Sequence, residues 1–267
     1  MEIFPLLLLA IIQGITEFLP ISSSAHLELI HKYFGETPDD LALDVAVHIG
    51  TLGAVIIYFR TDVQRAFFGF ISLCRGRIED PRIHLALCLI IATIPVVILG
   101  LLIKLAGFDE MLRSLAVMGW AMIIFGVLLW WADRNPKAEK TTEAWTMKDA
   151  VKLGLWQAIA LIPGTSRSGI TITGALQLGY TRHDAARIAM LMSIPTILAS
   201  AALLSVDVVA EANWQVLRSA AIAALLSFGA AYLALGLMMR LLQSISYTPY
   251  VIYRLILGAA ILVVAYN

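Results

Sequence analysis

The sequence predicts an all-α polytopic membrane protein, with six transmembrane helices and two re-entrant helical hairpins arranged as an inverted-topology repeat. Hydrophobic residues make up 60% of the 267 residues and charged residues 14%, whereas soluble domains are about half apolar and about a quarter charged. The 19 basic residues are balanced by 19 acidic ones. A nucleic-acid-binding protein needs a basic excess, so nucleic acid is excluded as a partner.

Six apolar stretches have the length of a membrane span, which is about 20 residues of helix. Each is flanked by polar or aromatic residues, as helices that cross a bilayer are. The predicted spans cover residues 43–59, 85–103, 115–131, 185–204, 216–239 and 250–266.

Two other apolar regions, residues 3–34 and 150–178, are interrupted by polar turns. Pro20 and the serine run 22–24 break the first, and the run 163–169 breaks the second. Each half has about 12 to 16 residues and is too short to cross the bilayer core. Non-helical backbone at membrane depth must be buried in protein or line a wet cavity. Both regions are therefore predicted to be re-entrant hairpins.

Loop charge predicts the orientation, because cytoplasmic loops of membrane proteins are enriched in Lys and Arg. Thirteen of the 19 basic residues fall on one face, which we assign to the cytoplasm: Arg60, Arg65, Arg75, Arg77, Arg82, Arg134, Lys137, Lys140, Lys148, Lys152, Arg182, Arg187 and Arg240. The opposite face receives Lys32, Lys104, Arg113 and Arg218. Both termini are then outside, the first hairpin enters from outside, and the second enters from the cytoplasm. Their polar tips are expected to meet.

The two broken regions resemble each other. Gln13-Gly14-Ile15, followed by Pro20 and the serines, is echoed by Gln157-Ala158-Ile159, followed by Pro163 and the run 165–168. A hairpin and three spans occur twice, in repeats of about residues 1–132 and 148–267, joined by a cytoplasmic loop within a single membrane domain, 1–267. Since three is odd, the second copy is inverted. Such repeats are typical of secondary transporters, so that function stays open.

Glu17 is a carboxylate within the first hairpin, and Gln13 shares its helix face. A charge at that depth costs roughly 2.5–3.5 kcal/mol on insertion scales unless it is paired or wet. Glu17 is therefore predicted to be a general base or a metal ligand, or else a packing carboxylate bonded to serines. Ser22, Ser23 and His26 follow. A serine at that position can simply cap the next helix, whereas Ser23 and His26 together suggest catalysis.

Arg167 is the basic residue in the polar turn of the second hairpin, and it opens a helix. Ser166 and Ser168 flank it, Gly164 frees the backbone before it, and Thr171 lies one turn further on the same face. Backbone N–H groups, hydroxyls and a guanidinium form a cradle for an oxyanion or phosphate. Neutralisation of Glu17 is the alternative role of Arg167. Together with the apolar surroundings, these residues predict an anion with an apolar body, such as a lipid phosphate.

Both turns carry the resemblance to a known family. Residues 13–26 read QGITEFLPISSSAH and resemble the (E/Q)xxxE-and-serine motif of the undecaprenyl-diphosphate phosphatase family, the bacitracin-resistance type. Residues 163–171 read PGTSRSGIT and resemble its PGxSRSxxT motif. The motifs occur in the expected order, and the length, the span number and the repeat match across essentially the whole chain.

The resemblance implies hydrolysis of undecaprenyl diphosphate, a polyprenyl diphosphate lipid, to the monophosphate and inorganic phosphate at the outer face of the bacterial cytoplasmic (inner) membrane. This recycles the carrier for peptidoglycan synthesis and confers resistance to bacitracin. A divalent cation, Mg²⁺ or Ca²⁺, is implied as well. Glu17 matches the essential acidic residue and a cation ligand, and Ser23 and His26 match the nucleophile and the acid or base. Arg167 completes the implied catalytic set.

The remaining residues of the motifs are implied to bind the substrate: Gln13, Ser22, Gly164, Ser166, Ser168 and Thr171. Gln13 stands where many relatives have Glu, which leaves one carboxylate rather than a pair. His48 lies where relatives often have Gln, and we expect it to pack at a helix interface.

Three questions stay open at the level of sequence. The nucleophile is Ser23, His26 or water. A flippase or transporter of the polyprenyl phosphate is the alternative function, and an intramembrane serine protease a third, although peptide cleavage does not need an arginine cradle. A homodimer is compatible with the sequence.

Overall fold

The computed structural model describes residues 3–35, 39–108, 112, 114–134, 138–209 and 214–267. Across these residues the regular structure is helical, apart from one isolated bridge between Lys140 and Tyr180. The helices are α1 (Ile3–Thr16), α2 (Ser23–Phe34), α3 (Asp40–Tyr58), α4 (Arg60–Cys74), α5 (Ile83–Ala106), α7 (Leu115–Ala132), α8 (Met147–Ala158), α9 (Arg167–Gln177), α10 (Arg182–Val209), α11 (Trp214–Leu241) and α12 (Thr248–Tyr266).

Six of these helices are long and apolar enough to cross a membrane, which confirms the six predicted spans. They are α3, α5, α7, α10, α11 and α12. Many of their large apolar side chains are exposed, as expected where a helix faces lipid rather than water. The chain is a multi-pass membrane protein.

Apart from α4, four helices are too short to span, and they form the two predicted helix–turn–helix regions. α1 and α2 have 14 and 12 residues, and α8 and α9 have 12 and 11. At 1.5 Å per residue they measure about 17 to 21 Å, against about 30 Å for a bilayer core. A short 3₁₀ turn, Ile159–Leu161, follows α8 directly. The breaks fall at the predicted polar runs.

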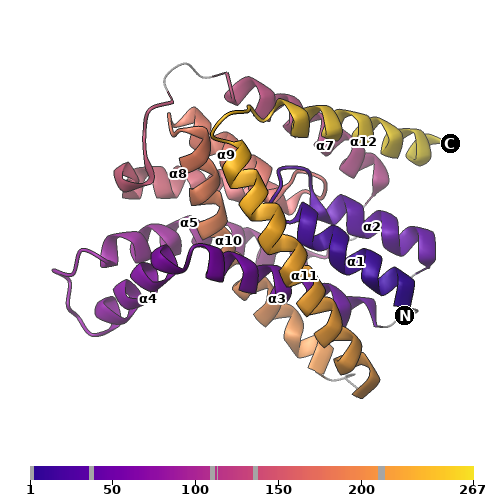
Figure 1. Ribbon diagram of the computed structural model, residues 1–267, viewed down its shortest axis with the longest axis horizontal. Coiled ribbons are helices and arrows are strands. Elements are labelled where there is room, and N and C mark those ends of the chain that lie inside the picture. Colours follow the sequence, from indigo (N-terminus) through magenta and orange to yellow (C-terminus); the bar gives the residue numbers. More distant parts are fainter. Residues whose placement is uncertain (1–2, 36–38, 109–111, 113, 135–137, 210–213) are drawn as a thin grey trace.

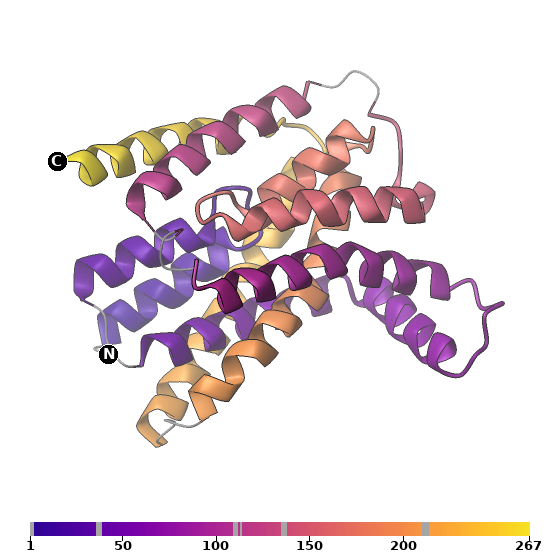
Figure 2. The ribbon, with the colours of Figure 1, turned by 180° about the vertical axis from the view of Figure 1, so that it is seen from behind.

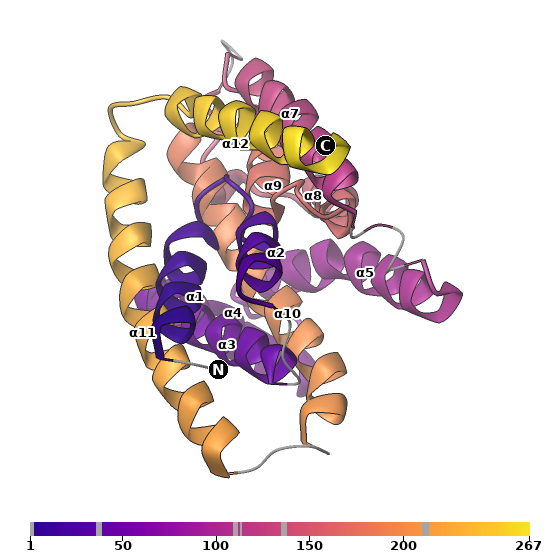
Figure 3. The ribbon, with the colours of Figure 1, turned by 90° about the vertical axis from the view of Figure 1, so that its right-hand side faces the viewer.

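The helices pack so that the two short pairs lie inside a frame of long ones. α1 packs against α11, and α8 packs against α5. α12 lies alongside α7 at the top of the molecule, and α3 pairs with α11 (Figures 1 and 3). The N- and C-termini lie at the same end, while α4 projects at the opposite end (Figures 1 and 2).

Helix α4 was not predicted, because residues 60–82 read as a charged loop. Its apolar residues are too few and too interrupted by polar ones for a span, yet Phe67, Phe68 and Phe70 give it one exposed aromatic surface. Gly69 lies against the backbone of Arg82, where a Cβ atom would overlap the Arg82 carbonyl oxygen. The close approach folds α4 back onto α5.

Arg254 is a charged residue within the predicted span 250–266 that the sequence alone does not single out. It lies in the middle of α12 and is completely buried. A 19-residue stretch with a single charge is still apolar enough to be predicted as a span, so hydropathy does not draw attention to Arg254. Two residues used for the orientation, Lys137 and Arg113, lie outside the described residues.

Candidate functional site

The turns of the two short helix pairs meet each other. The hydroxyl of Ser168 donates to the carbonyl oxygen of Leu19 at 3.0 Å, and the backbone N–H of Gly164 donates to the Ser24 hydroxyl at 3.5 Å. Segments about 140 residues apart in sequence are thereby joined at the first turns of α2 and α9. The expectation that the polar tips meet is confirmed.

Each turn contains a serine in a strained backbone conformation. Ser22 has φ 71° and Ser166 has φ 69°, and each immediately precedes a helix. In both turns the serine hydroxyl lies 3.1 Å from the hydroxyl two residues later, which belongs to Ser24 in the first and Ser168 in the second. Positive φ is uncommon for residues with a Cβ and typically marks a functional segment. Here it turns α2 and α9 toward a common point.

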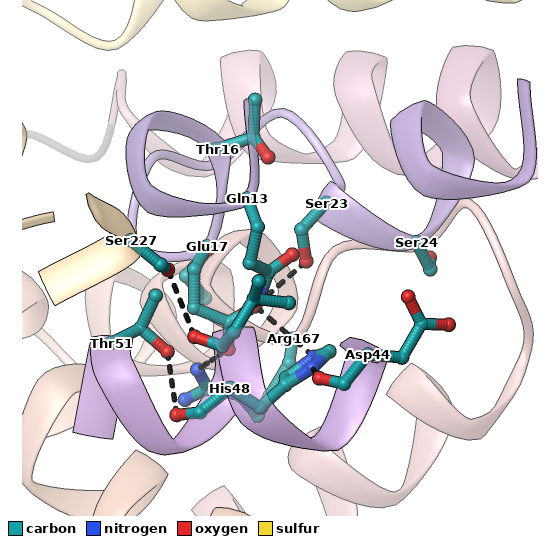
Figure 4. Close-up of polar contacts among 12 residues, drawn as sticks. Gln13, Thr16, Glu17, Ser23, Ser24, Asp44, His48, Thr51, Arg167 and Ser227 are labelled. Carbon is teal, nitrogen blue, oxygen red and sulfur yellow. Dashed lines mark hydrogen bonds and ion pairs between the residues drawn. The ribbon is translucent and has the colours of Figure 1, made fainter. Parts of the chain in front are cut away.

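Glu17 is the centre of the polar cluster (Figure 4). Its Oε1 accepts from Arg167 Nη2 at 2.7 Å, and its Oε2 accepts from the Ser23 hydroxyl at 2.7 Å. The Gln13 side-chain amide also donates to Oε2, at 2.9 Å. The carboxylate side chain is only 6% exposed, so the ion pair with Arg167 offsets a charge that burial would otherwise penalise. The alternative role of Arg167, neutralisation of Glu17, therefore has a geometric basis.

His48 joins this cluster from α3, contrary to the expectation of helix packing (Figure 4). Its Nε2 lies 3.8 Å from Glu17 Oε2, and its Nδ1 lies 2.7 Å from the carbonyl oxygen of Asp44. A carbonyl only accepts, so Nδ1 carries the proton and Nε2 faces the carboxylate. The sequence signal for His48 was a polar residue within a predicted span, which also occurs at packed interfaces.

A cavity of about 340 Å³ opens onto the cluster. Half of the lining residues are polar or charged, and we call them the charged wall: Glu17, Ser22, Ser23, Ser24, Asp44, His48, Ser166 and Arg167. The other lining residues are mostly apolar, and we call them the apolar wall: Leu41, Val45, Ala160, Thr196, Ile197, Ser200, Ala201 and Leu204. Its volume lies within the range of small-ligand sites, about 300–1,000 Å³. The two walls suit an anion that carries an apolar body.

Several buried polar atoms near the turns have no hydrogen-bond partner among the described residues, among them Gln13 Oε1, Thr165 Oγ1, Arg167 Nη1 and Thr171 Oγ1. Buried polar groups are nearly always paired, so unpaired ones call for an explanation. Arg167 lines the cavity, and its free Nη1 can donate to a bound anion. Thr171 is buried one turn further along α9 and does not line the cavity. Its hydroxyl faces the protein interior.

His26 is not brought to the Glu17 cluster. Its Nδ1 lies 2.7 Å from the Ser22 carbonyl oxygen and its Nε2 lies 2.6 Å from the Tyr253 hydroxyl. The two rings are stacked with centroids 5.7 Å apart. Ser23 is the first residue of α2 and its hydroxyl turns back to Glu17, whereas the His26 ring points toward Tyr253 of α12. Both ring nitrogens are engaged there, so in this arrangement Ser23 has Glu17, not His26, as its proton acceptor.

The residues that line the cavity suit a hard divalent cation whose remaining ligands are phosphate oxygens. Glu17 and Asp44 both line the cavity and supply carboxylate oxygens, the ligands that Mg²⁺ and Ca²⁺ prefer. Among the described residues, no group of three His, Cys, Asp or Glu side chains is placed to hold a metal by itself. The protein would therefore supply one or two ligands, and phosphate oxygens the others, as is usual for Mg²⁺.

These features define a polytopic membrane protein with a cavity whose lining suits a phosphate-bearing, lipid-like anion beside a serine and a carboxylate. The family model described as "Bacitracin resistance protein BacA" matches residues 6–260. The chain belongs to this family.

Curated relatives match the chain from end to end. Proteins of Dinoroseobacter shibae and Roseobacter denitrificans, each called undecaprenyl-diphosphatase, are 58% identical to it over 267 residues, which is 100% of this chain and of each relative. A protein of the same name from Ruegeria pomeroyi is 55% identical over the same length. The family predicted from the two turn motifs is confirmed.

We predict that Glu17→Gln lowers kcat by about 10²–10⁴-fold, the usual effect of losing a general base. The substitution keeps the side-chain volume but removes the charge that pairs with Arg167 and the oxygen that accepts the Ser23 proton. The kcat is measured from the release of inorganic phosphate from an isoprenyl diphosphate. Glu79→Gln, at an exposed position after α4, is the matched control and should retain wild-type activity. A Glu17→Gln variant as active as this control would contradict the prediction.

We also predict that His26→Gln and Tyr253→Phe have similar effects, each smaller than that of Glu17→Gln. Both remove the 2.6 Å bond between α2 and α12 without touching the Glu17–Ser23 pair. Steady-state kcat values for the three variants test this. A loss for His26→Gln as large as for Glu17→Gln, with Tyr253→Phe unaffected, would show instead that His26 acts on the substrate.

Proposed function

We propose that this protein hydrolyses undecaprenyl diphosphate to undecaprenyl phosphate and inorganic phosphate, and so recycles the lipid carrier of cell-wall synthesis and confers bacitracin resistance. The single observation that carries the proposal is the Ser23–Glu17–Arg167 cluster at the charged wall of a cavity whose other wall is apolar. Relatives of the same length that share more than half of their residues with this chain are called undecaprenyl-diphosphatase.

The charged wall has the parts that phosphoryl transfer requires, which are mainly positioning and charge stabilisation. Arg167 presents its unpaired Nη1, and the backbone N–H groups at the start of α9 point toward the same turn. Helix N-termini with free N–H groups favour phosphate. The apolar wall from α3 and α10 would accept the first isoprene units of the lipid.

Ser23 is the nucleophile in this mechanism. Its hydroxyl proton passes to Glu17 Oε2, 2.7 Å away, as Oγ attacks the terminal phosphorus. The bond from that phosphorus to the bridging oxygen breaks, and undecaprenyl phosphate leaves. Glu17 returns that proton to the departing phosphate. Water then attacks the phosphoserine, Glu17 takes a proton from the water and passes it to Ser23 Oγ as the P–Oγ bond breaks, and inorganic phosphate is released. Arg167 binds the equatorial oxygens throughout.

A divalent cation, Mg²⁺ or Ca²⁺, is part of the proposal. Arg167 is already paired with Glu17, so one guanidinium alone offsets little of the charge of a diphosphate. Glu17 and Asp44 would hold the cation, which would neutralise negative charge on the phosphates. His48, beside Glu17, would orient that carboxylate when Nε2 also carries a proton.

The membrane arrangement is proposed as follows. α1 with α2, and α8 with α9, are re-entrant hairpins of two inverted repeats, which is supported by the matched serines Ser22 and Ser166 and by their short lengths. Both termini are outside, and the cavity is reached from the outer face of the bacterial cytoplasmic membrane. The excess of Lys and Arg on the opposite loops supports this orientation.

We predict that the purified protein releases phosphate from a long-chain isoprenyl diphosphate in Mg²⁺ or Ca²⁺, and that EDTA abolishes release. No release by the wild type with either metal would overturn the enzyme assignment. Undiminished phosphate release in EDTA would contradict the proposed role of the cation but not the enzyme assignment.

Ser23→Ala should lower phosphate release by at least about 10²-fold. Acid quenching with terminally labelled substrate should leave label on Ser23 of the wild type. Label on His26, or on neither residue, would assign the attack to histidine or to water.

A flippase is the second candidate, because paired broken helices from inverted repeats are typical of transporters. It predicts translocation of polyprenyl phosphate across vesicles that survives Ser23→Ala. Loss of both activities in that variant would leave no separate transport function.

We predict that Ala201→Phe raises KM for a long-chain isoprenyl diphosphate about tenfold with little change in kcat. Ala201 lies on the apolar wall, and overfilling a packed site costs about 1–3 kcal/mol, where 1.4 kcal/mol is tenfold. Leu198→Phe, on the exposed side of the same helix, is the control. An unchanged KM for Ala201→Phe would show that the lipid lies elsewhere.

A further inference from the structure

Arg254 is a buried cation that the proposed mechanism does not use. It lies on α12, has 0% exposure, and is the largest fully buried side chain among the described residues. A charged side chain at such a position within a membrane span is costly and marks a functional role by default. It does not line the cavity of the Glu17 cluster.

The guanidinium of Arg254 donates to backbone carbonyl oxygens in three separate segments. Nη1 reaches Pro20 in the first turn at 3.4 Å. Nη2 reaches Gly164 at 3.2 Å and Thr165 at 2.8 Å in the second turn. Contacts to α7 complete the set, from Nε to the Met122 carbonyl at 3.1 Å and from Nη2 to that of Ala121 at 3.4 Å. The partners are all carbonyls, so the charge is balanced by backbone dipoles.

Two glycines leave the space that the Arg254 side chain occupies. A Cβ atom at Gly169, on α9, would lie 2.8 Å from Arg254 Nη1. A Cβ atom at Gly126, on α7, would lie 3.4 Å from the Arg254 Cβ. The guanidinium is thus enclosed between α7, α9 and the two turns.

We propose that Arg254 is a positioning residue that fixes the two turns relative to each other, and thereby sets the distance between Ser23 and Arg167. The inference rests on the proposed phosphatase function. Pro20 lies three residues before Ser23, and Thr165 lies two residues before Arg167, so a shift of either turn moves a reacting side chain. Carbonyls in non-helical backbone lack the partners a helix would supply, and Arg254 provides those partners.

Only arginine has the geometry for this task. The guanidinium has five N–H donors in a planar fork, whereas a lysine ammonium has three donors at one point. Lysine at position 254 keeps the charge but cannot reach both turns and α7 at once. A misplacement of about 1 Å at a reacting group can cost about 10²-fold in rate. Binding of the lipid is spread over the whole cavity and is less sensitive to such a shift.

The test measures kcat and KM of the full-length protein for phosphate release from a soluble short-chain isoprenyl diphosphate. Arg254→Lys and Arg254→Ala are compared with Arg240→Ala, an exposed arginine of α11. We expect kcat of both Arg254 variants to fall about 10²-fold while KM changes less than threefold, and Arg240→Ala to match the wild type. Wild-type kcat in Arg254→Lys, or a rise in KM with kcat unchanged, would overturn the proposal.

Ethylguanidinium supplies the atoms that Arg254→Ala removes, and it provides a second test. At millimolar concentration it should raise kcat of Arg254→Ala at least tenfold, while ethylammonium should not. It should also raise the Tm of Arg254→Ala but not that of Arg240→Ala. Failure of ethylguanidinium to change either kcat or Tm overturns the positioning role, even where the variant is poorly folded. A wild type without phosphatase activity would instead refute the proposed function, and the Tm response would still test the Arg254 contacts.

Discussion

The ion pair between Glu17 and Arg167 is the interaction on which the site depends. It joins residues 150 positions apart at 2.7 Å, and their side chains are only 6% and 14% exposed. Removing one partner of such a buried pair leaves an uncompensated charge, which typically costs about 3–5 kcal/mol. The two short helix pairs therefore stabilise each other, and neither half of the chain has a complete site alone. Ser23, Gln13 and His48 are arranged around the carboxylate that this pair holds.

Much of the architecture was predictable from length and composition. Spans such as 115–131 have nearly the observed bounds, because about 20 apolar residues in a row have few alternatives to a membrane helix. The two broken regions were recognisable since each half was too short to span. The convergence of Glu17, Ser23 and Arg167 followed from the matching order of residues in the two turns and from the need to pair buried charges.

The parts that the sequence did not predict depend on the rotation of helices and on contacts between distant segments. The side chains of Ser23 and His26 point to different partners because of how α2 is rotated. Their spacing of three residues had suggested that they act together. His48 lines the cavity because α3 presents that face to α1. Arg254 was hidden because the carbonyls that balance it belong to backbone, which carries no residue-type signal. Every residue has a backbone carbonyl, so the sequence does not show which carbonyls will bind a buried arginine.

The distance in sequence between Glu17 and Arg167 also has a consequence for biosynthesis. At roughly 5–20 residues per second, a ribosome needs about 8 to 30 s to add the 150 residues that separate them. During that interval α1 and α2 exist without the guanidinium, and the glutamate must be neutral or hydrated in the translocation machinery. The turns acquire their last donors only when α12 arrives with Arg254. Completion of the site is thus a late step, and a chain truncated before α12 would carry its reacting residues without the means to hold them in register.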